Sequence, residues 1–152
     1  MYADVVRRLH PKPEIGNPVM DRQENGSSFW LLLAGSLNMF LAVALGAFGA
    51  HALKASLPPD LMAVYHTGNQ YHVYHSLGLF AAAFAAARFR ASRLIQLSGV
   101  FILAGIILFS GSLYVLSLTG QRWIGAITPV GGAAFLAGWL LLAAGVWTGR
   151  RP

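Results

Sequence analysis

The sequence predicts an all-α membrane protein whose four transmembrane helices form an antiparallel, up-and-down bundle. Three observations lead to this fold class. Hydrophobic residues make up 56% of the 152 residues and charged residues only 11%, against about 25% charged residues in ordinary soluble domains. Four uncharged stretches are long enough to cross a hydrocarbon layer of about 30 Å. The basic residues gather in every second connection, which is the pattern of the cytoplasmic side.

The four uncharged stretches define the expected spans, which together make a transmembrane domain over residues 29–149. The spans are expected at residues 29–50, 69–87, 94–118 and 124–148. The second stretch is polar and aromatic in its first half and almost wholly apolar from Leu77 onward. An even number of spans returns the chain to the side of the membrane on which it started.

Residues outside the spans predict the ends of the elements. Residues 1–28 mix prolines, glycines and charges of both signs, so a flexible cytoplasmic tail is expected. A signal peptide cleaved near Ala47 is the alternative interpretation of the first apolar run. Pro58, Pro59 and Asp60 indicate a second helix that begins outside the bilayer and runs for about 30 residues, with Gly68 as its weakest point. Thr128 is expected to cap the fourth helix, with Pro129 at its first helical position.

The basic residues predict the orientation. Nine of the eleven lysines and arginines lie in the amino-terminal tail, the second connection or the carboxyl end. The second connection holds Arg88, Arg90 and Arg93 in a short loop, where basic residues weigh most. The first and third connections hold only Lys54 and Arg122. Both termini are therefore expected in the cytoplasm.

Small residues at regular spacing predict which helix faces pack together. Helices in lipid associate where small side chains let their backbones approach, and a seven-residue repeat implies a crossing angle near +20°. The expected contact residues are Gly131, Gly138 and Gly145 in the fourth span, Ser98, Gly105, Ser112 and Thr119 in the third, and Asn38, Ala42, Gly46 and Ala50 in the first.

The second span begins with a polar cluster, residues 65–75, which holds three histidines and three tyrosines. At 100° per residue, Tyr71 and His75 share one helix face, His72 lies about 60° beyond His75, and His66 points the opposite way. A short loop would bring His51 to the same level. We therefore expect a hydrogen-bonded polar site in the outer half of the membrane, made by His51, Tyr71 and His75 with Tyr114 in reach, because unpaired polar groups are costly there.

Several interpretations of this cluster stay open. A metal site would use His51, His72 and His75, with Asp60 as the nearest carboxylate. A b-type haem would need two imidazoles on opposite sides of its ring. A quinone or a lipid headgroup would need only a histidine, a tyrosine or an amide. In the simplest interpretation these side chains make interhelical hydrogen bonds and bind nothing.

Several chemistries are excluded or disfavoured. The chain has no cysteine, which excludes disulfides and thiolate sites. No acidic residue lies in an expected span, so the carboxylate relay of many transporters is missing. Nucleotide, hydrolase and metalloprotease motifs are absent. The formal charge of +6 comes from basic residues between apolar runs, which indicates membrane orientation and no nucleic-acid partner.

Four segments stand in order along the chain: residues 45–53, Tyr71 with His75, residues 109–114, and residues 128–132 followed by Gly138 and Trp139. They resemble the motifs of the domain-of-unknown-function family 423, which contains small four-span membrane proteins, mostly bacterial. The resemblance covers roughly residues 29–147. It implies a multi-pass protein of the bacterial inner membrane and brings no established activity. It also implies that His66 and His72 lie outside the family motifs. The positions that match the motifs are His51, Tyr71, His75, Ser110, Tyr114, Thr128 and Pro129.

These observations predict a small, non-enzymatic membrane protein that acts as an accessory subunit or on its lipid environment. Its partners would be the bilayer, another membrane protein or a second copy of the chain, and no cofactor is required. One alternative is a protein that binds quinone, lipid headgroup, haem or metal through the His/Tyr cluster. A second alternative is a permease for a small uncharged solute, which would need to oligomerise.

Overall fold

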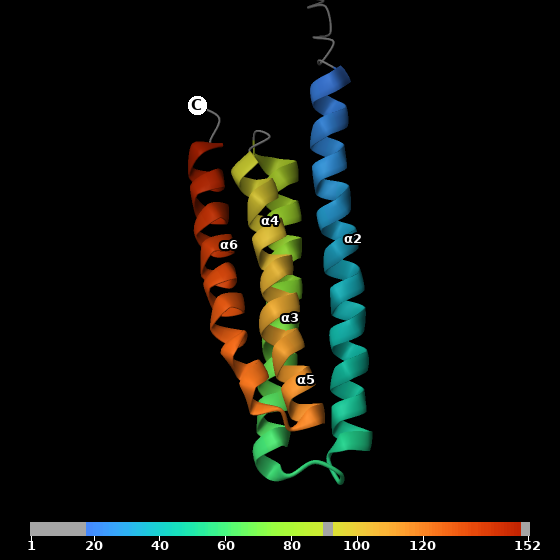
Figure 1. Ribbon diagram of the computed structural model, residues 1–152. Helices are drawn as coiled ribbons and strands as arrows, with labels where there is room; N and C mark the ends of the chain where they lie inside the picture. Colours follow the sequence, from blue (N-terminus) through green and yellow to red (C-terminus); the bar gives the residue numbers. More distant parts are fainter. Residues whose placement is uncertain (1–17, 90–92, 150–152) are drawn as a thin grey trace, which may run out of the picture.

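The computed structural model describes residues 18–89 and 93–149, and those residues form helices without any strand. The helices make four columns that lie lengthwise beside one another (Figure 1). The first column is α2 (Pro18–Phe48) with the π-helical η1 (Gly49–Leu53), and the second is α3 (Pro59–Arg88). The third is α4 (Arg93–Gly105), the π-helical η2 (Ile106–Ser110) and α5 (Gly111–Thr119), and the fourth is the 3-10 helix η3 (Arg122–Ala126) and α6 (Thr128–Thr148).

Three described helices are long and apolar enough to cross a membrane: Ser28–Leu53, Arg93–Thr119 and Arg122–Thr148. They overlap the expected first, third and fourth spans. The remaining helix, α3, has 30 residues, as expected for a helix that starts at Pro59. The first half of α3 is polar, so α3 is less apolar along its length than the other three helices.

Three expectations about element ends were wrong. The first helix begins at Pro18, so residues 18–28 are helical where a flexible tail was expected, while residues 1–17 lie outside the described part. Gly68 does not interrupt α3, because it is buried where a β-carbon would lie 3.1 Å from Leu113 Cβ. Thr128 does not cap α6: the cap residue is Ile127. The Thr128 hydroxyl instead lies 2.8 Å from the hydroxyl of Ser112.

The contact between α6 and the third column is made by glycines. Gly131, Gly138 and Gly145 are all buried. A β-carbon on Gly138 would lie 2.8 Å from Ile102 Cγ1, and one on Gly145 would lie 2.6 Å from Ile95 Cγ1. Small residues here let the two backbones approach.

The contact between α2 and α3 follows the same principle with larger partners. Phe80 packs over Gly35, the Asn69 side chain over Gly46, and Tyr65 over Gly49. Residue numbers therefore rise along α2 as they fall along α3. Among the predicted packing positions of the third column, Gly105 receives the ring of Phe135, whereas Thr119 is exposed.

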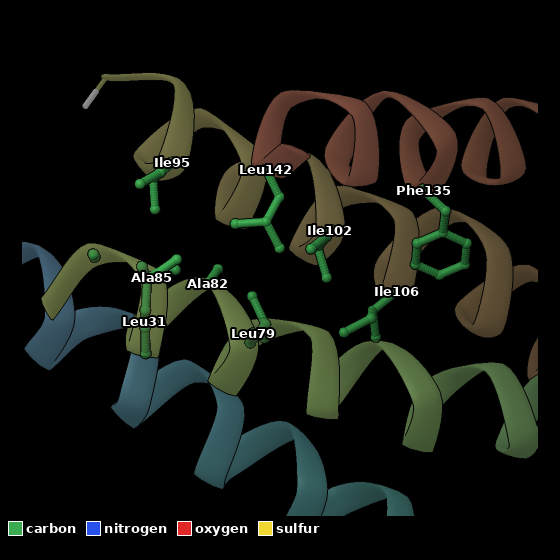
Figure 2. Close-up of a cluster of buried hydrophobic side chains, with 11 residues drawn as sticks. Leu31, Leu79, Ala82, Ala85, Ile95, Ile102, Ile106, Phe135 and Leu142 are labelled. Carbon is green, nitrogen blue, oxygen red and sulfur yellow. The ribbon is translucent and has the colours of Figure 1, made fainter. Parts of the chain in front are cut away.

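Buried apolar side chains fill the space between the columns (Figure 2). Leu31, Leu79 and Ile102 are fully buried there. Only 17–33% of each candidate span is buried. Because the spans are apolar throughout, their outward faces are apolar as well. Large exposed side chains include Phe40 on α2 and Leu140 on α6, which are 70% and 72% exposed. Such a surface suits lipid, because apolar patches of this extent are rare on soluble monomers.

Candidate functional site

A chain of hydrogen bonds links α2, α3 and α5 inside the bundle. His72, almost fully buried, lies at its centre. The His72 Nε2 is 3.3 Å from the Asn38 side-chain oxygen and its Nδ1 is 3.3 Å from the Tyr114 hydroxyl. Asn69 donates to the same hydroxyl at 3.1 Å and to the carbonyl of Ala42 at 2.7 Å. Three columns are thereby tied together by side chains.

The donor and acceptor roles in this chain are mutually consistent. The Asn38 amide nitrogen donates to the Ala34 carbonyl at 2.8 Å, which leaves the Asn38 side-chain oxygen as an acceptor. His72 must then donate from Nε2 and accept at Nδ1, which fits a neutral imidazole. Tyr114 donates to that Nδ1 and accepts from Asn69. Because the groups satisfy one another, we interpret this chain as a structural clamp.

Tyr65 extends the clamp toward the end of α2. Its ring is buried and lies 5.0 Å from the ring of Tyr114 between centroids. Its hydroxyl donates to the carbonyl of Leu45 at 2.7 Å. Tyr65 thus fixes the place where α2 passes into η1, and no group of the Tyr65 side chain is left for a ligand.

A separate groove of about 490 Å³ lies between α3 and α6, with Phe109 of η2 at its side. Aromatic rings form most of its wall. The His75 ring stacks on Phe135 with centroids 3.3 Å apart, and Tyr71 stacks on Phe109 at 4.6 Å. Trp139 lies 6.2 Å from His75. The full lining is Tyr71, His75, Phe109, Pro129, Gly132, Ala133, Phe135, Leu136 and Trp139.

The polar atoms of this groove are not all paired. The His75 Nδ1 lies 2.8 Å from the carbonyl of Tyr71, one turn earlier in the same helix. No described residue hydrogen-bonds to the other ring nitrogen, Nε2. This atom is not fully buried. The Tyr71 side chain is 38% exposed and its hydroxyl has no partner among the described residues. The groove therefore offers two free polar atoms on an apolar wall.

The groove meets the middle of α3 and the first half of α6. His75 is 16 residues after Pro59 and 13 residues before Arg88, which is about 24 Å and about 20 Å along the axis at 1.5 Å per residue. Its neighbour Phe109 lies inside the third column, at η2. On α6 the lining residues extend from Pro129 to Trp139, the second to the twelfth of the 21 residues of that helix. The placement of the site in the outer half of the membrane stays a prediction.

The expected polar site is assembled only in part. Tyr71 and His75 lie together, with ring centroids 5.8 Å apart. Tyr114 belongs instead to the clamp around His72. His51 is exposed in η1, and no hydrogen bond joins it to Tyr71 or His75. The expectation that His51 completes this site was wrong.

The three-histidine metal hypothesis has no geometric basis in this fold. The described part of the chain contains no group of three histidine or acidic side chains placed to hold a metal ion. His72 points to Asn38 and Tyr114, whereas His75 lies against Phe135. His51 is at the end of another helix. Asp60, the nearest carboxylate in the metal hypothesis, lies 3.5 Å from Arg122.

Sequence reasoning missed Asn69 and assigned Asn38 only a packing role. The signal that could have found Asn38 is its isolation: it is the one amide in an otherwise apolar stretch, and such groups in a membrane helix require a partner. Asn69 could have been found in the same way at the start of the second uncharged stretch.

Ser110 is one of the motif positions. Among the described residues, its hydroxyl oxygen is the one fully buried side-chain oxygen or nitrogen that has no hydrogen bond.

Comparison with known proteins places this geometry in a family. The family model "Protein of unknown function (DUF423)" matches residues 45–132, which include the clamp residues of α3 and α5 and the first half of the groove. No solved structure matches the chain.

Curated relatives cover most of the chain. A UPF0382 membrane protein of Bacillus subtilis, YwdK, is 49% identical over 111 residues, which are 73% of this chain and 90% of that protein. The UPF0382 inner membrane protein YgdD of Escherichia coli K12 is 42% identical over 119 residues, which are 78% of this chain and 90% of that protein. A UPF0382 membrane protein of Staphylococcus saprophyticus is 42% identical over 116 residues, which are 76% of this chain and 95% of that protein. The chain is therefore a membrane protein that belongs to the DUF423 family, whose function is not established.

Proposed function

We propose that this protein is a non-enzymatic, four-span protein of the bacterial inner membrane that holds a lipid-soluble molecule in the groove between α3 and α6. The observation that carries the proposal is the unpaired Nε2 of His75 on a wall of aromatic rings. A polar atom left unpaired at membrane depth costs about 1–3 kcal/mol by mutational estimates. A ligand that supplies the missing hydrogen bond would recover that free energy.

The antiparallel bundle is supported by the pairwise contacts. Along α2 and α3 the order of contacting residues is reversed, and the same holds for α6 against the third column, where Gly131 meets Phe109 and Gly145 meets Ile95. Figure 1 draws the start of α2 and the end of α6 at the same end of the molecule. Four crossings with α3 as the second span fit this arrangement.

The orientation is supported by the charges at the two ends. Arg88 and Arg93 bound the connection at the end where α2 starts, whereas Lys54 and Arg122 lie at the opposite end. The first end is therefore the cytoplasmic one under the positive-inside rule. The relative from Escherichia coli is named an inner membrane protein, which fits the same location.

A binding role is favoured over catalysis by the composition of the groove. Tyr71 and His75 are the titratable side chains among its lining residues, and no carboxylate lines it. His75 is a possible general base, but the carboxylate that orients a catalytic histidine would have to come from elsewhere. Aromatic walls with a few convergent polar atoms are the usual form of a small-molecule site.

Analysis of co-purifying compounds tests this function. The wild type, the variant His75→Phe and the variant His66→Phe would be purified in mild detergent and extracted with organic solvent for mass spectrometry. His75→Phe keeps a ring against Phe135 and removes the free nitrogen, while His66 is exposed elsewhere on α3 and serves as the matched control. We expect one lipid-soluble compound enriched in the wild type and in His66→Phe and lost from His75→Phe. Equal compound profiles for all three proteins would contradict the proposal.

A further inference from the structure

We infer that the molecule bound between α3 and α6 is a planar hydroxyl-bearing donor of the hydroquinone class, which the protein binds in its reduced form and rejects in its oxidised form. The inference rests on the proposed function, which requires only that some lipid-soluble molecule occupies the groove. It adds the direction of the hydrogen bond and the shape of the bound group.

The direction of the hydrogen bond follows from the backbone contact of His75. The carbonyl of Tyr71 can only accept, so the Nδ1 of His75, 2.8 Å away, carries the hydrogen. A neutral imidazole has one donor and one acceptor nitrogen. The exposed Nε2 is therefore a bare acceptor, and the ligand must supply the donor.

The neutral form of His75 follows from its surroundings. The faces packed around it come from α3, η2 and α6, and they contribute the rings of Tyr71, Phe109, Phe135 and Trp139 and no acidic side chain. The nearest described acidic residue along α3 is Asp60, at the start of the helix, where it pairs with Arg122. A charged imidazolium buried among aromatic rings without a counter-charge would be costly.

The shape of the groove favours a flat ring. Tyr71 and His75 lie nearly parallel, at 16°, and His75 and Phe135 at 12°. Offset stacking on such surfaces is favourable for aromatic groups. A flat ring that stacks on this wall can direct a hydroxyl group at Nε2. An aliphatic alcohol can donate the same hydrogen bond but gains nothing from stacking.

The aromatic wall separates this ligand from a phospholipid. The rings of Tyr71, Phe109, Phe135 and Trp139 line the groove with His75. A phospholipid headgroup supplies ammonium or hydroxyl donors but no flat ring to stack on this wall. A hydroquinone supplies both the hydroxyl donor and the flat ring.

Oxidation should abolish the recognition. A quinone presents carbonyl oxygens, which only accept, so its oxygen would face the lone pair of Nε2 with no hydrogen between them. The Tyr71 hydroxyl can either donate or accept, and it therefore does not distinguish the two forms. Discrimination rests on His75.

The test compares one molecule in two redox states. The protein, reconstituted in lipid nanodiscs, would be titrated with decylubiquinol and with decylubiquinone under matched conditions, with empty nanodiscs as the partition control. We expect saturable binding of decylubiquinol and at least about tenfold weaker binding of decylubiquinone. His75→Phe should lose binding of decylubiquinol, and His66→Phe should keep it.

Nitrogen NMR of protein labelled at histidine supplies a second readout that does not depend on affinity. The His75 signals, assigned from the spectrum of His75→Phe, should show hydrogen on Nδ1 and none on Nε2, and decylubiquinol should shift the Nε2 signal. Hydrogen on Nε2 would overturn the inference. Equal binding of both redox forms would overturn it while leaving the proposed groove ligand intact, and binding of neither would overturn it as well.

Discussion

Gly131 of α6 lies so close to Phe109 of η2 that a β-carbon on the glycine would overlap the backbone nitrogen of Phe109. The two residues begin a matched series. Gly131, Gly138 and Gly145 meet Phe109, Ile102 and Ile95, and both sets repeat every seven residues. The contact is therefore a continuous seam between two helices.

Gly131→Ala should destabilise the protein clearly more than Gly132→Ala. The new methyl group at residue 131 meets backbone atoms that cannot move aside, and such overpacking costs about 1–3 kcal/mol. At residue 132 the nearest atom would be 3.8 Å away, an ordinary contact. Thermal unfolding in detergent measures both variants. Equal midpoints would show that the seam is absent in the membrane protein.

Tyr114→Phe should cost about 1–3 kcal/mol, because it leaves the Nδ1 of the buried His72 without its donor and removes one of the two acceptors of Asn69. Tyr74→Phe is the matched control: Tyr74 is 51% exposed on the same helix as His72 and bonds only to the exposed Gln70. Its removal should change stability by at most about 0.5 kcal/mol. Denaturant titration in mixed micelles compares the two. A loss in Tyr74→Phe as large as that in Tyr114→Phe would refute the clamp.

Asp60→Asn and Arg122→Gln should each leave stability almost unchanged. The two side chains are 3.5 Å apart but 62% and 85% exposed, and exposed pairs contribute about 0–1 kcal/mol. A double-mutant cycle at low and at high salt isolates their coupling. Coupling of several kcal/mol would show that the pair itself is strong and would contradict its exposure to solvent.

Reporter fusions test the orientation of the four columns. A fusion after Pro152 and one between Arg88 and Arg93 should both report the cytoplasm, and a fusion near Pro58 should report the opposite side, because basic residues are retained in the cytoplasm. An alkaline phosphatase and a fluorescent protein at each position give complementary signals. A periplasmic signal from the carboxyl end would exclude four crossings.

The sequence predicted which residues of the candidate site share a helix face, but not which residues they meet on other helices. The pairing of Tyr71 with His75 was predictable, because residues four apart share a helix face. The neighbours of that face were not, because the rotation of α3 about its axis decides whether His75 meets α2 or α6. The same rotation turns His72 toward Asn38 and Tyr114. The His51 expectation failed because loop length limits distance but does not direct a side chain inward.

Hydropathy and residue spacing by themselves determined that the chain is helical, which stretches are apolar and where helices approach, since these properties repeat along a single helix with a fixed period. Tertiary structure alone decided the partners. It separated a satisfied clamp around His72 from a groove in which the Nε2 of His75 is unpaired. The physical reason is that a hydrogen bond between helices depends on the rotation and depth of both, to within about an ångström, whereas the sequence specifies only the face of each.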